Sequence, residues 1–443
     1  MDKFIINGGR KLKGATQVSG SKNVALKTLV AACLTDEQVI IDNIPLISDL
    51  FIMADIIREL GGRVEAKNHC VKIQAKDMKN TKIALERAVE VRTSAMFMAP
   101  LLARKGEAII PNPGGCRIGA RPIDRTIDGL SEMGVNVIYK SSDGYFYMSA
   151  PDGLHGADYT FKKSTHTGTE TLILAGVLAK GKTILRNSAQ EPEIDELIEL
   201  LKRMGARIKK TADRTIEIEG VKKLSGAKYS VGPDRNEVVT LGIAAIITKG
   251  DVTVKGVDSK DLKSFIEKMR EIGAGVEETP SGIRFFYKGE LSAADIETGT
   301  YPSFMTDWQA PFAVLMTQAK GESIIHERVY ESRFGYVSQL QKMGANIKLF
   351  NPEVENPQEF YNFNIEDDNS DNKHAARIKG AVRLHNAVVT ISDLRAGATL
   401  VLAALAARGE SAILEVYHLD RGYEKFEDRL NSLGAQILRE NDE

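Results

Sequence analysis

The chain of 443 residues lacks a long apolar run, and it lacks an excess of charge of either sign. No stretch approaches the roughly 18 apolar residues that indicate a membrane-spanning helix, and the first residues, MDKFIINGGRKLKG, contain no apolar signal core. With 59 basic and 60 acidic side chains the net charge is −1, so no overall field attracts nucleic acid or an anionic membrane. We therefore expect no membrane and no nucleic-acid partner.

Cysteine is scarce as well. Cys33, Cys70 and Cys116 are far apart and form neither a disulfide framework nor a C-x-x-C metal pair. This usage predicts reduced thiols and a cytoplasmic protein. His166 and His418 stand alone, without a second ligand at metal spacing, so we expect no metal site. The chain also lacks the P-loop, G-x-G-x-x-G and G-x-S-x-G motifs.

What the chain does contain is a sixfold repeat. In each copy an amphipathic helix runs through a glycine into a short strand, as in LIELLKRMGARI, and glycine directly after a helix is the usual left-handed cap. An Ala-rich helix that is apolar on every side, followed by a strand, precedes each of these pieces and should be buried. The six glycines are Gly61, Gly134, Gly205, Gly273, Gly344 and Gly434.

The repeat predicts an α/β protein of two similar domains with three units each, every unit reading helix–strand–loop–helix–strand. We expect residues 22–231, with the Cys116 loop, to form one domain and residues 1–21 plus 232–443 the other. The last glycine spacing is 90 residues and the others are 68 to 73. The excess is the acidic, Asn-rich stretch 351–376, which we interpret as a surface insertion or mobile loop. Repeats alone would also fit a binding scaffold without chemistry.

Cations at equivalent repeat positions favour a functional site. Lys22 opens the first apolar helix, where a cation is unfavourable unless an anion is present and where free N–H groups suit a phosphate. Arg92 and Arg395 also stand before apolar helices, and Arg121, Arg333 and Arg421 lie in loops before outer helices. One such arginine is usually a solvated charge or a surface ion pair. Six cations in both halves predict a cluster, in a cleft between the halves, around a doubly charged planar ligand.

Two further side chains have the character of reacting groups. Cys116, in PNPGGCRIGARPID, lies between glycine and arginine in a loop that cannot bury it, and Arg117 and Arg121 favour its thiolate. Asp307, in TDWQ, precedes an apolar helix. It is either an N-cap or a carboxylate that accepts a proton from a substrate hydroxyl.

The motifs SGSKN, VRTS, PGGCRIGARPID, EPEI, PDR, TDWQ, ESRF, DLRA and YHLDRGYE together resemble those of the UDP-N-acetylglucosamine enolpyruvyl transferases, a branch of the EPSP synthase superfamily. The resemblance covers nearly the whole chain, in order, outside 351–376. It implies a two-domain inverse α/β barrel with the active site in the interdomain cleft. It also implies transfer of enolpyruvate from phosphoenolpyruvate to the 3-hydroxyl of UDP-N-acetylglucosamine, with release of phosphate, as the first committed step of peptidoglycan synthesis.

The same resemblance implies the roles of individual residues. Lys22, Arg121 and Arg421 would hold phosphoenolpyruvate, with Arg92 and Arg395 completing the charge lining. Cys116 would donate a proton and add covalently to phosphoenolpyruvate, and Asp307 would take the proton of the 3-hydroxyl. The residues expected at the sugar, the intermediate and the uridine are Asn23, Asp393, Arg333, Arg121, Pro122, Ile123, Asp124, Arg125, Lys163, Ser164, Thr165, His166, Val329 and Tyr330. No metal or organic cofactor is implied, because the cations supply the electrostatic stabilisation, and we expect a monomer or a weak homo-oligomer.

The chain departs from the family pattern at three places. Arg125 follows RPID where the family usually has a histidine, His166 interrupts the SVGATEN-like motif, and Met305 replaces a proline. All three belong to the nucleotide or sugar side, so two alternatives stay open. One is an enolpyruvyl transferase with another acceptor, such as shikimate 3-phosphate, against which Cys116 speaks. The other is a catalytically silent repeat protein that binds a nucleotide sugar.

Overall fold

Six buried helical segments determine the architecture. The computed structural model describes residues 2–114, 118–120 and 122–440. The buried segments are α1 (Lys22–Ala32), the 3-10 helix η1 (Arg92–Phe97) continued by α4 (Met98–Lys105), α6 (His166–Gly176), α8 (Arg235–Ile247), α10 (Thr306–Gln318) and α13 (Leu394–Ala406). Their burial confirms the prediction. Only the second of these segments is divided into two helices. Pro100 lies in the first turn of α4, where its missing N–H leaves no helical hydrogen bond unmade.

Six outer helices follow, each ended by one of the predicted glycines. They are α2 (Ser48–Glu59), α5 (Asp124–Glu132), α7 (Pro192–Arg203), α9 (Lys263–Glu271), α11 (Val337–Lys342) and α15 (Phe426–Ser432). The backbone φ of the glycine after each helix lies between +88° and +103°. A residue with a Cβ is strained there, which confirms the role of the six glycines as helix caps.

Each repeat contains at least one strand more than predicted. The two predicted strands of a repeat never pair directly, because a third strand lies between them and is antiparallel to both. These middle strands are β5 (Cys70–Gln74), β8 (Tyr145–Ser149), β12 (Thr215–Glu219), β16 (Gly282–Phe286), β21 (Ala375–Gly380) and β1 (Lys3–Asn7). In the last repeat the missing strand is therefore supplied by the beginning of the chain.

The strands form six sheets. In one half, the strands besides the middle ones are β3 (Val39–Asp42), β4 (Arg63–Lys67), β6 (Glu107–Pro111), β7 (Asn136–Lys140), β9 (Asp158–Thr160), β10 (Lys182–Arg186), β11 (Arg207–Ala212) and β13 (Lys228–Ser230). The strand orders of the three sheets in this half are β13-β3-β5-β4, β6-β8-β7 and β11-β12-β10-β9. In the other half, the strands besides the middle ones are β2 (Lys13–Gln17), β14 (Asp251–Lys255), β15 (Gly275–Thr279), β17 (Ile296–Gly299), β18 (Phe304–Met305), β19 (Gly321–His326), β20 (Asn346–Phe350), β22 (Val388–Thr390), β23 (Glu410–Leu414) and β24 (Ile437–Glu440). The strand orders of the three sheets in this half are β15-β16-β14-β2, β18-β17-β19-β21-β20 and β22-β23-β1-β24. The remaining short helices are α3 (Leu85–Glu90), η2 (Lys260–Leu262), α12 (Pro357–Phe360), η3 (Ile365–Asp367) and α14 (Tyr417–Asp420).

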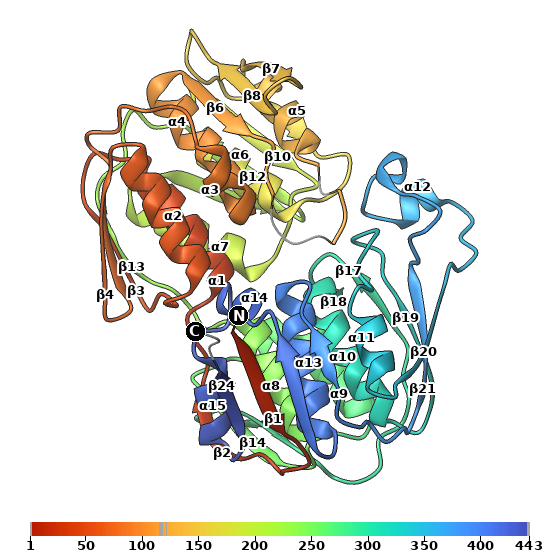
Figure 1. The fold of residues 1–443 in the computed structure, drawn as a ribbon. Helices are drawn as coiled ribbons and strands as arrows, with labels where there is room; N and C mark the ends of the chain where they lie inside the picture. Colours follow the sequence, from red (N-terminus) through yellow and green to blue (C-terminus); the bar gives the residue numbers. More distant parts are fainter. Residues whose placement is uncertain (1, 115–117, 121, 441–443) are drawn as a thin grey trace. The chain divides into compact units, whose positions relative to one another are not determined.

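The chain divides into two compact units, each with its own hydrophobic core. Unit 1 comprises the described residues within Met1–Ser19, Cys116–Arg121 and Pro233–Glu443, and unit 2 those within Gly20–Gly115 and Pro122–Gly232. In unit 1 the helices α8, α10 and α13 pack side by side (Figure 1). Residues 118–120, which we expected in the other half, group with unit 1 because the Ile118 carbonyl accepts from Ser332 N at 3.2 Å and Ala120 N donates to Glu331.

The acidic segment 351–376 begins after β20, forms an excursion and ends in the first two residues of the paired strand β21, and it carries structure of its own (Figure 1). It includes α12 and η3, and its side chains Tyr361, Phe363 and His374 are buried. Among the described helices, none combines the length and the apolar character that crossing a membrane requires.

The helix-ending glycines allow a clean test of backbone strain. Gly205 has a φ of +100° and open space where a Cβ would stand, so Gly205→Ala changes backbone conformation without a clash. We expect a loss of about 1–2 kcal/mol in the free energy of unfolding, measured by urea denaturation. Gly335→Ala is the matched control, because its nearest neighbour would be 3.7 Å away and its φ is not positive. An equal loss in both variants would contradict this explanation.

Candidate functional site

In unit 1 two buried arginines hold the carboxylate of Asp307. Arg333 Nη2 donates to Asp307 Oδ1 at 2.9 Å, and Arg395 Nη2 donates to Oδ2 at 3.2 Å. The arginine side chains are 4% and 9% exposed, whereas that of Asp307 is 28% exposed. Asp307 is the second residue of α10 and Met305 is the N-cap, so the N-cap interpretation is wrong. The arrangement presents a fixed carboxylate that a ligand can reach.

The two arginines also determine the charge state of Asp307. Burial alone would raise its pKa, but the guanidinium groups of Arg395 and Arg333 more than offset that effect and hold the pKa well below its usual range. Asp307 is therefore ionised at neutral pH and accepts hydrogen bonds, but it is a weak base while both arginines face it. An anion that draws one guanidinium away would make the carboxylate more basic.

The start of α13 positions Arg395. Asp393 caps this helix: its Oδ1 accepts from the backbone N–H groups of Arg395 at 3.0 Å and Ala396 at 3.1 Å. Arg395 Nη1 donates to Tyr423 Oη at 3.1 Å, and Tyr423 Oη lies 2.9 Å from Thr240 Oγ1. The cap and the tyrosine leave the other guanidinium nitrogen directed at Asp307.

Arg235 is a residue of this cluster that was not among the predicted site residues. It is the first residue of α8, and its guanidinium lies 5.6 Å from the ring centre of Trp308 and 5.4 Å from that of Tyr301, which is cation–π distance. Its charge also lowers the pKa of Asp307. The signal that could have found it is its position at the start of an apolar helix, which it shares with Lys22 and Arg92.

Glu327 connects the Asp307 cluster to the predicted pair Val329 and Tyr330. It is fully buried, its Oε1 accepts from Val329 N at 2.8 Å and Tyr330 N at 3.1 Å, and its Oε2 accepts from Thr306 Oγ1 at 2.9 Å. Burial raises the pKa of Glu327. No sequence motif marks Glu327, but its hydrogen bonds connect the 327–330 turn to Thr306, the residue before Asp307.

Cys116 and Arg121 lie outside the described residues. Arg421, the C-cap residue of α14, is half-buried. Burial and the positive charge of Arg421 together lower the pKa of His418, three residues before it.

In unit 2 the predicted cation at the start of α1 has an internal partner. Ser21 caps the helix, and Lys22 Nζ lies 2.8 Å from Asp49 Oδ2, with side chains 12% and 3% exposed. The carboxylate of α2 thus offsets the unfavourable cation at a helix start. Asn23 follows, half-buried. Arg92 begins η1, and its Nη1 donates to the Pro113 carbonyl at 3.4 Å.

The structure brings together two predicted acceptor segments that are 39 residues apart. Arg125, in the first turn of α5, donates from Nη1 to the Ser164 carbonyl at 3.5 Å. Thr165 caps α6 by accepting from Gly168 N at 3.3 Å. Ser164 is buried and Lys163 is half-buried, and Ile123 is the half-buried N-cap of α5 between the exposed residues Pro122 and Asp124.

His166 belongs to a buried charge chain. Glu170, fully buried, lies 3.2 Å from Lys27 Nζ and 3.2 Å from His166 Nε2. Burial alone would lower the pKa of His166, but Glu170 more than offsets it and raises that pKa. For Glu170, burial is outweighed by His166 and Lys27, so its pKa is lowered. Neither Lys27 nor Glu170 was among the predicted site residues.

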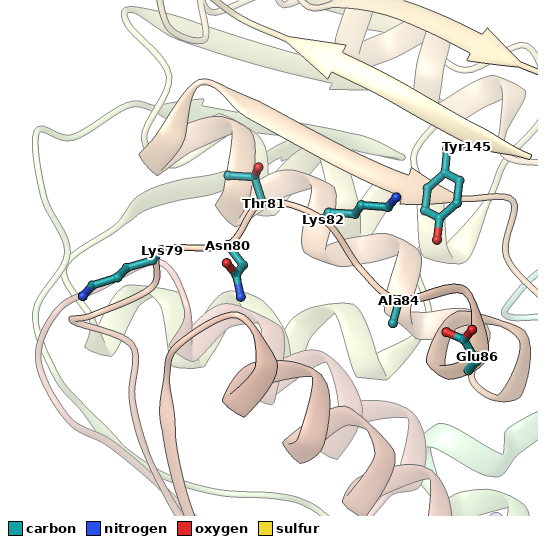
Figure 2. A pocket seen from close by; sticks show the side chains of 7 residues that line it. All are labelled: Lys79, Asn80, Thr81, Lys82, Ala84, Glu86 and Tyr145. Atoms are coloured by element: carbon teal, nitrogen blue, oxygen red, sulfur yellow. The ribbon is translucent and has the colours of Figure 1, made fainter. Parts of the chain in front are cut away.

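A hollow of about 580 Å³ in unit 2 lies away from the predicted residues. It is lined by Lys79, Asn80, Thr81, Lys82, Ala84, Glu86 and Tyr145 (Figure 2). Lys82 Nζ lies 4.4 Å from the Tyr145 ring centre, while Lys79 points the other way. Because its side chains do not converge, we do not assign the candidate site to this hollow. Within the described part of the chain, no group of three or more metal-binding side chains lies together.

Comparison with known proteins gives consistent results. The model of the EPSP synthase (3-phosphoshikimate 1-carboxyvinyltransferase) family matches residues 6–430. A Koribacter versatilis protein named UDP-N-acetylglucosamine 1-carboxyvinyltransferase is 40% identical and covers 99% of this chain and 96% of its own. A Caldanaerobacter subterraneus protein named UDP-N-acetylglucosamine 1-carboxyvinyltransferase 3 is 42% identical, with 99% of each chain covered.

Solved structures show a shared fold over the whole chain. The crystal structure of the enolpyruvyl transferase NikO from Streptomyces tendae matches with a TM-score of 0.84 and 22% identity, covering 100% of this chain and 99% of that one. An EPSP synthase structure from Acinetobacter baumannii matches with a TM-score of 0.74 and 19% identity, covering 100% of both chains.

The buried charge chain gives a stability test. Glu170→Gln leaves Lys27 without its buried counter-ion, so we expect a loss of about 3–5 kcal/mol in the free energy of unfolding. The lowered pKa of Glu170 means that its contribution is present above about pH 4.3, its unfolded value, and is lost as pH falls through the folded pKa. The raised pKa of His166 means that its contribution is present below about pH 6.5 and is lost as pH rises through the folded pKa.

The difference between wild type and Glu170→Gln should therefore be largest between about pH 4.5 and 6.5. Denaturant titrations across pH measure it. Asp128→Asn is the control, because its ion pair with Lys162 is 46% and 83% exposed and contributes at most about 1 kcal/mol. A loss that does not decrease as pH rises above about 6.5 would mean that His166 is not coupled to Glu170.

Proposed function

The chain belongs to the EPSP synthase family of carboxyvinyltransferases, and we propose that it transfers the enolpyruvyl group of phosphoenolpyruvate to the 3-hydroxyl of UDP-N-acetylglucosamine. The names of relatives about 40% identical over nearly the whole chain support this acceptor. The observation on which the chemistry depends is the carboxylate of Asp307, fixed by Arg333 and Arg395 and partly exposed.

The reaction is an addition followed by an elimination. A proton adds to the methylene carbon of phosphoenolpyruvate, and the sugar oxygen bonds to the neighbouring carbon while its own proton passes to Asp307. The resulting ketal then loses phosphate and a methyl proton, which restores the double bond in the product. We assign the proton donor to Cys116 and the base to Asp307.

Binding of the donor can raise the basicity of Asp307. Phosphoenolpyruvate carries up to three negative charges, and we propose that Lys22, Arg92, Arg121, Arg395 and Arg421 neutralise them. Arg395 Nη2 now faces Asp307 at 3.2 Å. If Arg395 turns part of its charge to the donor, the pKa of Asp307 rises towards its ordinary value. The base would then become competent only when the donor is bound.

The other two cysteines are unsuited to act as nucleophile or proton donor. Cys33 is fully buried, and burial raises its pKa to about 12. Cys70 is half-buried, and burial together with its hydrogen bond to Asp42 raises its pKa as well. A thiol with a raised pKa contributes little thiolate. Their environments support Cys116 as the reactive thiol.

Phosphate release tests the reaction and the acceptor together. With phosphoenolpyruvate, we expect release in the presence of UDP-N-acetylglucosamine and none with shikimate 3-phosphate or without acceptor. Asp307→Asn should lower kcat by about 10²- to 10⁴-fold, because it removes the base. Asp258→Asn, at an ion pair with Lys260 that is 64% exposed on the aspartate side, should leave kcat unchanged.

Phosphate release with shikimate 3-phosphate but not with UDP-N-acetylglucosamine would show that shikimate 3-phosphate is the acceptor. A folded protein that binds the nucleotide sugar without any release would favour the non-catalytic alternative, and full activity of Asp307→Asn would remove Asp307 from the mechanism.

Covalent labelling tests the thiol. An epoxide phosphonate such as fosfomycin should add one equivalent to the wild type, detected by intact-protein mass spectrometry. Cys116→Ser should abolish the adduct, whereas Cys33→Ala and Cys70→Ser should keep it, because their thiols are buried or have a raised pKa. An adduct that survives Cys116→Ser and disappears with Cys70→Ser would assign the reactivity to Cys70.

A further inference from the structure

The acidic excursion 351–376 contacts the chain at the end of β19, directly before the Val329–Tyr330 pair. His326 Nε2 lies 3.1 Å from Tyr361 Oη, and the His326 ring centre is 5.0 Å from that of Phe360. Asn362 N donates to the Arg328 carbonyl at 2.7 Å. We call residues Phe360, Tyr361 and Asn362 the clamp.

Arg328 makes the closest contacts with the clamp. Its Nε and Nη2 donate to the Phe360 carbonyl at 3.2 and 3.1 Å, and its guanidinium lies 3.9 Å from the Phe360 ring centre. Its backbone N donates to Thr298 Oγ1 at 2.9 Å. A stacked and doubly bonded guanidinium is geometrically specific, so Arg328 is held in one orientation.

The excursion has the internal support that a clamp needs. Tyr361 stacks on Phe363 at 4.8 Å between ring centres, and His374 lies 5.0 Å from Tyr361 and 5.1 Å from Phe363. His374 Nε2 in turn lies 2.8 Å from Asp368 Oδ2. Tyr361, Phe363 and His374 are each at most 6% exposed. This small aromatic core makes the clamp a rigid element rather than a solvated loop.

Glu327 transmits the clamp's position to the site. His326 and Arg328 contact the clamp, while Glu327, between them, accepts from Val329 N, Tyr330 N and Thr306 Oγ1. Thr306 precedes Asp307, and the Tyr330 ring centre is 5.7 Å from the guanidinium of Arg333, which holds Asp307. The clamp, residues 326–330 and Asp307 thus form one connected network.

We propose that the excursion 351–376 is a positioning element for the acceptor: through Arg328 and Glu327 it fixes the 326–330 segment beside Asp307, where the acceptor hydroxyl is deprotonated. This inference rests on the proposed function for the identity of the acceptor. In this role the excursion acts through residues 326–330 and not by direct contact with a substrate. Loss of the clamp should therefore weaken acceptor use and leave the donor site, with its own cations, intact.

The test compares two arginines on either side of the excursion. Arg328→Met removes the contacts with the clamp. Arg377→Met is the matched control, because Arg377 also lies over a ring, Phe350 at 5.4 Å, and pairs with Glu322 at 2.9 Å, but contacts no residue of 326–330. We expect Arg328→Met to raise KM for UDP-N-acetylglucosamine about 5- to 30-fold, with KM for phosphoenolpyruvate within twofold of wild type. Tyr361→Phe, which removes only the bond to His326, should have a smaller effect of the same kind.

Hydrogen–deuterium exchange separates this inference from the proposed function. The amides of Val329 and Tyr330 donate to Glu327, so their exchange should accelerate in Arg328→Met and stay unchanged in Arg377→Met, whether or not the protein turns over. Unchanged exchange, or equal changes in both KM values, would overturn the positioning role. Wild-type protein that releases no phosphate, together with accelerated exchange in Arg328→Met, would overturn the proposed reaction and leave the clamp in place.

Discussion

A helix that is apolar on every side has to be covered on every side, and this constraint organises the molecule. The six inner helical segments can be reached only at their ends, because sheets, outer helices and one another cover their flanks. Each of them carries an ionisable residue at its first or second position. These residues are Lys22, Arg92, His166, Arg235, Asp307 and Arg395. A fold that buries six apolar helices thus leaves six helix starts where polar chemistry is possible.

Cations at helix starts oppose the helix dipole, and the protein offsets this with carboxylates. Asp49 faces Lys22, Glu170 faces His166, and Asp307 faces Arg395. Exposure separates the roles of two of these acids. Glu170 lies one turn inside α6 and is 0% exposed, so its charge is confined to Lys27 and His166, whereas Asp307 lies in the first turn of α10 and is 28% exposed. The buried ion pairs of Glu170 therefore stabilise the fold, whereas the carboxylate of Asp307 is accessible to a ligand.

Local patterns in the sequence predicted the local features of this structure. Three features were predicted in this way: the glycines that end the outer helices, the burial of the Ala-rich helices, and the charged residues at helix starts. Each of them is determined by residues that are close together in the sequence. The middle strand of each repeat was missed, although in the first four repeats it pairs as a hairpin with the strand directly before it. Only β1, which pairs with β23 and β24 some 400 residues away, was beyond any local pattern. The partners Asp49 and Glu170 were missed because tertiary packing decides which charges meet: Asp49 is 27 residues from Lys22, and Glu170 pairs with Lys27, 143 residues before it, as well as with the nearby His166. Arg235 could have been predicted, because it is the first residue of α8, just as Lys22 is the first residue of α1.

The three departures from the family pattern have local explanations that leave the Asp307 cluster intact. Arg125 is bonded to the Ser164 carbonyl, His166 is paired with Glu170, and Met305 is the N-cap residue of α10 with its side chain against the core. Arg125 and His166 lie at the starts of adjacent helices, α5 and α6, so each alters the same corner of unit 2. The clamp, by contrast, acts on unit 1. All three departures thus lie at helix starts with local partners, while the cations Lys22, Arg92 and Arg395, which we propose for the donor, stand at the starts of α1, η1 and α13.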